Sequence, residues 1–266
     1  MRRLAAGCLG LLFVGLACGV PDDGPSVREP IEDVSLAGKV CPGADRVEGI
    51  DVSYYQKNID WPKVKAGGYE FAIVRASDGL GFKDPDFAKN WSGAKSAGMI
   101  RGVYQFFRPG SDAKAQAELV LDAIGNKLEP GDLPPVIDVE SADGQSPSKV
   151  AAAVKTWITT VEGKLGRKPI IYTGRPFWVN SVGDPPGYED YPLWIAAYPY
   201  CYDTIKSGAY CPNIPDKWSK WTFWQYGDGK NTEGQGCQIN PPVVPGVGQS
   251  CDRNFFNGTL AQLQQL

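Results

Sequence analysis

The sequence predicts an α/β protein, an irregular (β/α) barrel of the TIM type that is helix-poor in its C-terminal part. Short apolar segments alternate with helical stretches over the first two thirds of the 266 residues, and this order predicts parallel strands joined by right-handed crossovers. After Tyr172 the connections are instead rich in Pro, Gly, Tyr and Cys. Most expected strands end in a polar or aromatic residue. Active sites of such barrels lie at the carboxyl ends of the strands, so we expect a cup of acids and aromatic side chains there.

Local signals give the boundaries of the expected elements. Asp60 is a suitable N-cap with Pro62 in the first helical turn, and Gly166 ends the helix that begins at Ser146-Pro147. The expected helices are 60–65, 84–97, 111–128 and 146–165. The expected strands are 47–53, 69–76, 101–107, 134–140, 168–173, 193–198, 221–226 and a short eighth at 252–256.

The chain divides into three parts. Residues 1–17 have the basic start and short apolar core of a secretory signal. Residues 18–46 form a polar tether, and residues 47–266 form the barrel domain. The cleavage site resembles that of a bacterial lipoprotein with Cys18 as the lipidated residue; ordinary cleavage nearby, giving a secreted protein, is the alternative. We therefore expect an exported protein, held in the envelope (periplasmic or surface) by a lipid anchor or secreted.

Composition excludes several classes of function. The chain has 27 basic and 30 acidic residues, so neither a nucleic-acid surface nor an electrostatic membrane patch is expected. It contains no histidine, which excludes a Ser-His-Asp triad, a Cys-His dyad and a His-ligated zinc site. An enzyme with this composition takes its acid and base from carboxylates, Tyr, Lys or Cys. We expect no metal, no cofactor and a monomer.

The cysteines fit an exported protein. None of them forms a CxxC pair, which disfavours a zinc knuckle or a redox motif. We expect the disulfides Cys201–Cys211 and Cys237–Cys251, each of which closes a short loop. Cys41 is then left over, and it could instead pair with one of these four, because sequence alone does not settle connectivity.

The segment PPVIDVE, residues 134–140, is the most informative stretch. It is a short β-branched apolar run that ends in two acids, which is typical of a buried strand. Side chains alternate along a strand, so Asp138 and Glu140 share one face. Paired carboxylates on one face suit glycoside hydrolysis, whereas a strand-end acid pair that caps a helix or meets an arginine is the alternative.

Ten motifs together resemble the family 25 glycoside hydrolases, the bacterial, phage and fungal muramidases. They occur in the family's order from about residue 47 onward. They are GIDVS (49–53), IDW (59–61), FAIVRASDG (71–79), Asp86/Phe87/Asn90, AGMIRGVYQFF (97–107), PPVIDVE (134–140), RKPIIYTG (167–174), PLWIAAY (192–198), FWQYGDG (223–229) and DRNFFNGTL (252–260). One departure is Gln105, which stands where related sequences often carry a histidine.

The resemblance implies an irregular barrel that cleaves the β-1,4 bond between N-acetylmuramic acid and N-acetylglucosamine in peptidoglycan. It implies that Glu140 is the general acid and that Asp138 assists through the substrate's 2-acetamido group. Asp51 and Asp252 would line the same cup, although Asp252 could simply cap a turn. The implied sugar-binding residues are Tyr104, Tyr172, Trp194, Tyr198 and Gln225, of which the aromatic ones could instead belong to the barrel core.

Protonation of the acids is a further expectation. Burial and neighbouring carboxylates raise the pKa of an acid, so we expect Glu140 to be protonated before catalysis and Asp138 to be ionised. Acids two residues apart on a strand have Cα atoms about 6–7 Å apart, which favours a retaining mechanism, through the acetamido oxygen or a covalent intermediate, over an inverting one. A non-catalytic glycan-binding envelope protein on the same fold is the alternative function.

Overall fold

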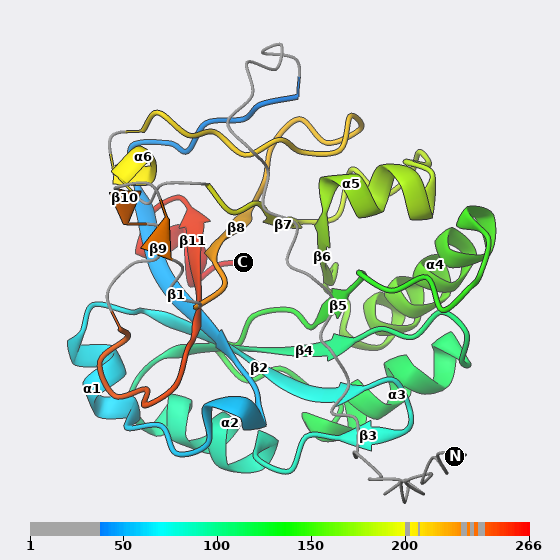
Figure 1. Cartoon of the computed structure of the whole chain (residues 1–266). Helices are drawn as coiled ribbons and strands as arrows, with labels where there is room; N and C mark the ends of the chain where they lie inside the picture. Colours follow the sequence, from blue (N-terminus) through cyan, green and yellow to red (C-terminus); the bar gives the residue numbers. More distant parts are fainter. Residues whose placement is uncertain (1–37, 200–202, 207, 230–232, 235–236, 239–242) are drawn as a thin grey trace, which may run out of the picture.

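The computed structural model describes residues 38–199, 203–206, 208–229, 233–234, 237–238 and 243–266. The expected signal, Cys18 and most of the tether lie outside these residues, as does Cys201. The described part forms a barrel with helices along much of its outside (Figure 1). Within the described ranges, no helix combines the length and apolar character needed to cross a lipid bilayer.

Eight strands among the described residues close into a mixed barrel, which confirms the predicted fold class. Around the barrel they are β1 (Arg46–Val52), β11 (Asp252–Asn257), β8 (Phe223–Gly227), β7 (Leu193–Ala196), β6 (Ile170–Gly174), β5 (Val136–Asp138), β4 (Ile100–Phe106) and β2 (Phe71–Asp78), and pairing of β1 with β2 closes the ring. β3 (Phe82–Lys83) pairs with β2 outside the ring, and β9 (Glu233–Gly234) pairs with β10 (Cys237–Gln238).

The last barrel strand departs from the expected parallel order. β11 runs antiparallel to both of its neighbours, β1 and β8. An antiparallel neighbour needs no crossover helix, which agrees with the absence of a helical pattern between β8 and β11. The direction also has a consequence for the site. β11 begins at the end of the barrel where β1 finishes, so its first residue, Asp252, lies opposite Asp51 in register.

The helices are concentrated on one side of the barrel (Figure 1). They are α1 (Trp61–Ala66), α2 (Phe87–Ser96), α3 (Ala113–Ala123) and α4 (Pro147–Leu165). Among the described residues after β6, the helical segments are all short, namely α5 (Arg175–Phe177), η2 (Trp178–Val182), α6 (Asp203–Lys206) and α7 (Leu260–Leu263). The expectation of a helix-poor C-terminal part is therefore confirmed.

Two apolar layers hold the barrel together. The inner layer fills the barrel with side chains such as Phe71, Ile73, Val136 and Phe223. The outer layer lies between the strands and the helices. The inner layer explains the glycine of GIDVS: a Cβ on Gly49 would lie 2.4 Å from the Phe71 ring, so only glycine fits there.

The disulfide pattern corrects the expectation from sequence. Cys41 bonds to Cys211 and not Cys201 to Cys211, and Cys251 is a buried free thiol, so the predicted Cys237–Cys251 bridge is absent as well. Cys41 reaches Cys211 because residues 38–43, which were expected in the tether, pack on the barrel.

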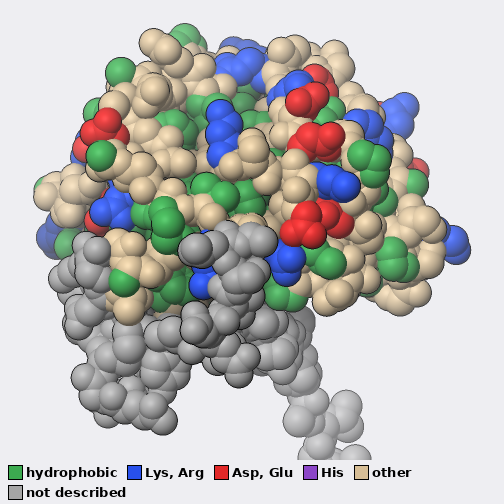
Figure 2. Space-filling model, turned by 90° about the horizontal axis from the view of Figure 1, so that it is seen from above, with side chains coloured by type: hydrophobic (Ala, Val, Ile, Leu, Met, Phe, Trp, Pro, Cys, Tyr) green, Lys and Arg blue, Asp and Glu red, His purple; other side chains and the backbone are tan. Residues whose placement is uncertain are grey.

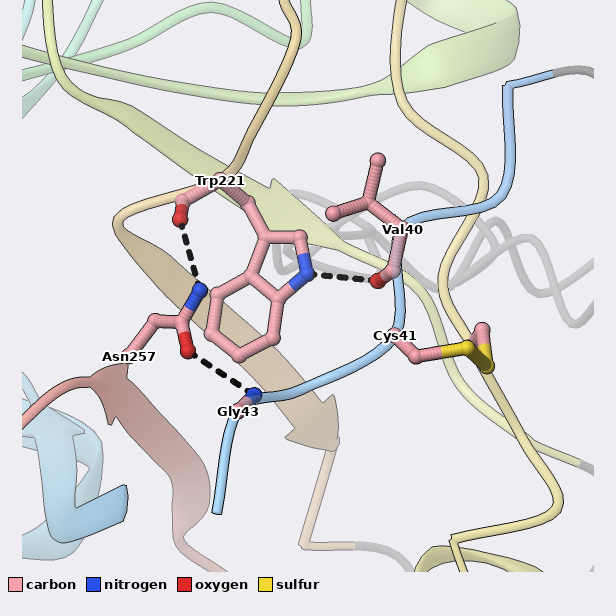
Figure 3. The surroundings of a disulfide bond; sticks show 6 residues. Val40, Cys41, Gly43, Trp221 and Asn257 are labelled. Carbon is pink, nitrogen blue, oxygen red and sulfur yellow. Dashed lines mark hydrogen bonds between the residues drawn. A yellow bond between two sulfur atoms is a disulfide. The ribbon is translucent and has the colours of Figure 1, made fainter. Parts of the chain in front are cut away.

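Further hydrogen bonds fasten the same N-terminal segment. The Trp221 indole donates to the Val40 carbonyl at 2.7 Å, and the Gly43 amide donates to Asn257 Oδ1 at 3.0 Å (Figure 3). This brings Cys41 beside the loop that carries Cys211. A disulfide between residues far apart in the sequence therefore closes over the helix-poor side of the barrel.

Candidate active site

Four acids meet at the carboxyl ends of the parallel strands. Asp51 lies near the end of β1 and faces Asp252 at the start of β11. Asp138 is the last residue of β5, and Glu140 follows two residues later. The four carboxyl groups lie close enough to influence one another electrostatically. The charges of Glu140 and Asp51 raise the pKa of Asp138, and the charges of Asp51 and Glu140 raise the pKa of Asp252. The structure therefore brings together all four acids that the sequence singled out.

Asp51 is buried and saturated with protein hydrogen bonds. Its side chain is 6% exposed. The Asn254 amide Nδ2 donates to Asp51 Oδ2 at 2.7 Å, and the Gln225 Nε2 donates to the same oxygen at 2.9 Å. A further hydrogen bond joins its carboxyl group to that of Asp252. Burial raises the pKa of Asp51 from 3.8 to about 6 against the opposing effect of these hydrogen bonds.

Asp252 holds its proton more tightly than Asp51. Burial and the charge of Asp51 raise the pKa of Asp252 well above its ordinary value, with further contributions from Asp228 and Glu140. Two carboxyl groups that share a hydrogen bond need one proton between them. Within the pair the proton therefore belongs to Asp252, and Asp51 is the carboxylate.

Asp138 has the same burial as Asp51 and a different set of partners. It is 6% exposed, and its buried Oδ1 has no hydrogen-bond partner among the described residues. Burial, then the charges of Glu140 and Asp51, raise the pKa of Asp138 well above its ordinary value, while Arg75 acts in the opposite direction. An unpartnered buried oxygen is costly, and in a site it marks the place for a donor from a ligand.

Glu140 differs from the expectation. It is exposed, whereas the sequence analysis placed it in a buried position. β5 ends at Asp138, so Glu140 stands on the loop above the barrel. The expected division, with Glu140 protonated before catalysis and Asp138 ionised, stays a prediction. In the free protein the surroundings of Asp138 favour its protonated form.

The residues proposed to bind sugar take two different positions. Trp194 and Gln225 are each 2% exposed and Tyr172 is 7% exposed, so they belong to the barrel interior. Tyr104 and Tyr198 are only partly buried. Burial raises the pKa of the Tyr104, Tyr172 and Tyr198 hydroxyls well above 10, so these groups remain protonated and can donate hydrogen bonds.

The interior residues form a hydrogen-bonded network that ends at Asp51. The Tyr172 hydroxyl donates to Gln225 Oε1 at 2.8 Å, and Tyr198 donates to the same oxygen. The Trp194 indole donates to Asn254 Oδ1 at 2.8 Å. Asn254 was missed by the sequence analysis, although it follows Asp252 by two residues and so shares its face of the strand.

Gln105 lies on the other side of the barrel wall. It is fully buried, donates to Ser77 Oγ at 2.7 Å and accepts the Trp157 indole N–H at 2.8 Å. Its side chain thus points toward α4 and away from the cup. The departure from related sequences at this position therefore lies outside the acidic site.

An aromatic group above β1 and β2 was also missed. The 3-10 helix η1 (Tyr54–Gln56) places Tyr54 with its ring centroid 5.4 Å from that of Phe82 on β3. Arg75 lies beneath them, with its guanidinium 5.1 Å from the Tyr54 ring centroid, and it bonds Asp84 at 3.1 Å. Arg75 therefore does more than neutralise the cup, because it also supports this aromatic rim.

Charge on the outside of the molecule is mixed. Seen from above in Figure 2, acidic and basic side chains lie interspersed over the described part of this face. No group of three or more His, Cys, Asp or Glu side chains among the described residues is arranged to hold a metal ion.

Comparisons with known proteins agree with this geometry. The family model "Glycosyl hydrolases family 25" matches residues 50–235. The chain is 34% identical over 229 residues to the uncharacterized protein YegX of Escherichia coli, covering 84% of this chain and 74% of that protein. It is 33% identical over 233 residues to lysozyme M1 of Streptomyces globisporus, covering 83% and 71%.

A solved structure gives the same result. The bacterial lysozyme from Streptomyces coelicolor superposes with a TM-score of 0.72 at 30% identity, covering 84% of this chain and 98% of that one. The matched family model spans more than half of the chain and includes Asp51, Asp138 and Glu140. The chain therefore belongs to glycosyl hydrolases family 25 and is a glycoside hydrolase whose relatives include lysozymes.

Proposed function

We propose that this protein is a lysozyme that hydrolyses the β-1,4 bond between N-acetylmuramic acid and N-acetylglucosamine in peptidoglycan strands. The observation that carries the proposal is the buried, unpartnered Oδ1 of Asp138, two residues before the exposed Glu140 in an acidic cup. An amide N–H is the donor that this oxygen lacks, and the 2-acetamido group of the substrate supplies one. Family membership and the lysozymes among the relatives support the same activity.

Glu140 is the general acid and Asp138 is its partner. Glu140 protonates the glycosidic oxygen of the leaving sugar. Asp138 accepts the acetamido N–H and orients the acetamido oxygen toward the anomeric carbon. As the bond to the leaving oxygen breaks, the acetamido oxygen forms a bond to that carbon, and the Asp138 carboxylate stabilises the resulting positive charge. Water then attacks the anomeric carbon and displaces the acetamido oxygen, whose bond to that carbon breaks. Glu140 takes up the proton of the water, so configuration is retained.

Substrate binding sets the protonation states for this reaction. In the free protein Asp138 has the raised pKa and Glu140 is exposed. A sugar placed over the cup covers Glu140, and loss of solvent raises the pKa of an acid. The same sugar donates its amide N–H to Asp138, which favours the ionised form. Binding thus moves the proton toward Glu140, where the leaving group needs it.

Sugar contacts come from the partly exposed aromatic residues of the rim. Tyr104 and Tyr198 are partly exposed and keep protonated hydroxyls, and Tyr54 and Phe82 extend the aromatic surface beyond the acids. Behind this surface lie Tyr172, Trp194 and Gln225, which belong to the hydrogen-bonded network that ends at Asp51. Aromatic faces suit sugar rings because they present broad apolar area together with polar edges.

The protein acts in the cell envelope or outside the cell. The proposed leader in residues 1–17 carries it across the membrane, and acylation of Cys18 anchors it by lipid. The anchor has its own test, mass spectrometry of the mature N-terminus. A diacylglyceryl-modified Cys18 is expected, whereas an unmodified mature end elsewhere contradicts the anchor and leaves the activity untouched. As a monomer, the protein would reach glycan strands through the length of the tether.

The activity is tested with the protein from residue 19 onward, which keeps Cys41. Purified peptidoglycan is digested with wild type, Glu140→Gln and the control Glu118→Gln, which alters an exposed acid on α3. Fragments are reduced with borohydride and identified by mass spectrometry. We expect reduced muramic acid ends from wild type and from the control. Glu140→Gln should release about 10²–10⁴-fold fewer of them, because it lacks the general acid.

Other outcomes distinguish the alternatives. Reduced glucosamine ends would contradict the proposed bond and keep the hydrolase. No release by wild type, with glycan binding retained by both proteins, would establish a binding protein on this fold. The anomeric form of the first product, read by NMR, separates retention from inversion.

A further inference from the structure

Asp51 is an anion held by neutral amides. The same oxygen, Oδ2, accepts Nδ2 of Asn254 at 2.7 Å and Nε2 of Gln225 at 2.9 Å. Asp51 is 6% exposed and Asn254 is fully buried. In a buried site of low dielectric constant, two N–H donors stabilise a carboxylate substantially, because hydrogen bonds to charged groups are stronger than those between neutral groups. The direction in which each amide points therefore decides whether Asp51 meets donors or acceptors.

The indole of Trp194 determines the direction of the Asn254 amide. The two ends of an asparagine amide have nearly the same shape, so their partners decide which end points where. The Trp194 Nε1–H is a donor only and donates to Asn254 Oδ1 at 2.8 Å. This leaves Nδ2 for Asp51. A tyrosine hydroxyl can donate or accept, so the Tyr172 and Tyr198 contacts restrict Gln225 less strictly.

We propose that Trp194 and Asn254 are positioning residues for the reaction: the donor-only indole sets the polarity of the Asn254 amide, which keeps Asp51 ionised and directed into the cup. This role rests on the proposed function, since it assigns a purpose to Asp51 in the same site. The two residues touch no substrate. They act through Asp51, whose negative charge keeps the proton of the pair on Asp252.

The electrostatic surroundings support this role. Burial raises the pKa of Asp51 to about 6, and the hydrogen bond from Asn254 is the largest contribution that opposes the rise. Charged and titratable groups reach the Asp51–Asp252 pair and Asp138 from every neighbouring element. They are Asp138 at the end of β5, Glu140 after it, Arg75 and Asp78 on β2, Asp228 after β8, Cys251 before β11, Tyr104, Tyr172 and Tyr198.

The test removes the indole N–H and keeps an aromatic ring. In Trp194→Phe the Asn254 amide is free to turn its oxygen toward Asp51, so the pKa of Asp51 rises. The acid limb of kcat/KM against pH reports ionisations of the free enzyme. We expect it to move about one unit toward higher pH, the equivalent of one charge-assisted hydrogen bond, with KM at neutral pH unchanged.

Trp157→Phe is the matched control. Its indole also donates to a side-chain amide oxygen, Gln105 Oε1, at 2.8 Å, and both tryptophans are buried. Trp157 lies outside the barrel wall. Removal of its N–H lowers stability similarly and should leave the acid limb in place. Equal displacement of the limb by both variants would show a general effect of destabilisation and overturn the proposal.

A double-mutant cycle separates the two positioning residues. Asn254→Ala should displace the acid limb in the same direction, and adding Trp194→Phe should displace it no further, because the indole acts only through Asn254. Independent, additive displacements would contradict the mechanism.

The titration of Asp51 is also read without any substrate. Carbon-13 NMR of the Asp51 carboxyl in each protein gives its pKa directly. A raised Asp51 pKa in Trp194→Phe and not in Trp157→Phe confirms the positioning role even if wild type releases no peptidoglycan fragments. An unmoved Asp51 pKa in a folded Trp194→Phe protein overturns it. If Trp194→Phe does not fold, Asn254→Ala carries the same two outcomes.

Discussion

Asp138 and Asp51 are equally buried, but their carboxyl groups differ in the hydrogen bonds that they receive from the protein. Asp51, on the helix-poor side, is saturated by amides from β8 and β11. Asp138, on the helix-covered side, keeps one buried oxygen without a partner. Burial alone therefore does not identify the carboxylate that meets substrate. We propose that the unsatisfied oxygen does, since its cost is recovered when a ligand donates to it.

The largest effect expected from this comparison is a loss of turnover in the Asp138→Asn variant. The substitution retains size but removes the negative charge that would stabilise the developing positive charge on the substrate. We expect kcat on peptidoglycan to fall by about 10²–10⁴, with folding intact by circular dichroism. Asp190→Asn, on an acid with an 82% exposed side chain, is the control. Near wild-type kcat for Asp138→Asn would show that its free oxygen is not reserved for substrate.

The second effect concerns stability of the helix-poor side. The Cys41–Cys211 bond joins residues 170 positions apart, and it fastens a region that lacks the helices of the other side. Replacing both cysteines by alanine should lower the free energy of unfolding by about 2–5 kcal/mol, measured by urea titration. Hydrogen exchange should increase around β8 more than in α4. Uniform protection across both sides would contradict a local fastening role.

A third effect is the pH dependence of stability that follows from the raised pKa of Asp51. The folded-state pKa of Asp51 is raised from 3.8 to about 6, so this side chain favours the folded state below pH 3.8, and that contribution is lost as pH rises through 6. At neutral pH the cost is at most about 3 kcal/mol. The stability of Asp51→Asn relative to wild type should therefore rise between pH 4 and pH 7 in urea titrations. A difference independent of pH would refute the raised pKa.

Sequence reasoning located the acids because their signals are local. Asp138 and Glu140 lie at the end of an apolar run, and Asp51 ends another, so strand periodicity places them at the cup. The helix Pro147–Leu165 was predicted with its C-terminal boundary correct, because proline at its start and glycine after its end are local signals as well.

The features that sequence reasoning missed depend on long-range geometry. The disulfide partner of Cys41 is set by how residues 38–43 cross the barrel, which no spacing of cysteines records. The exposure of Glu140 follows from β5 ending two residues early, and strand ends are set by pairing with neighbours. The antiparallel course of β11 and the amide orientation of Asn254 need the closed barrel. Several polar side chains expected to contact substrate also hydrogen-bond with other side chains of the site, which spacing along the sequence does not reveal.

The smallest effect is expected from Gln105→His, which tests whether the outer layer of the barrel influences the acids of the cup. Gln105→His places the residue common in related sequences at a fully buried site outside the barrel. A neutral imidazole has one donor and one acceptor nitrogen, which can replace the bonds to Ser77 and Trp157. Because neither bond reaches the acids, we expect stability within about 1 kcal/mol of wild type and an unchanged pH profile of kcat/KM. A displaced acid limb in this variant would mean that the barrel wall does not isolate the two layers, and that the outer face of β4 also tunes the acids.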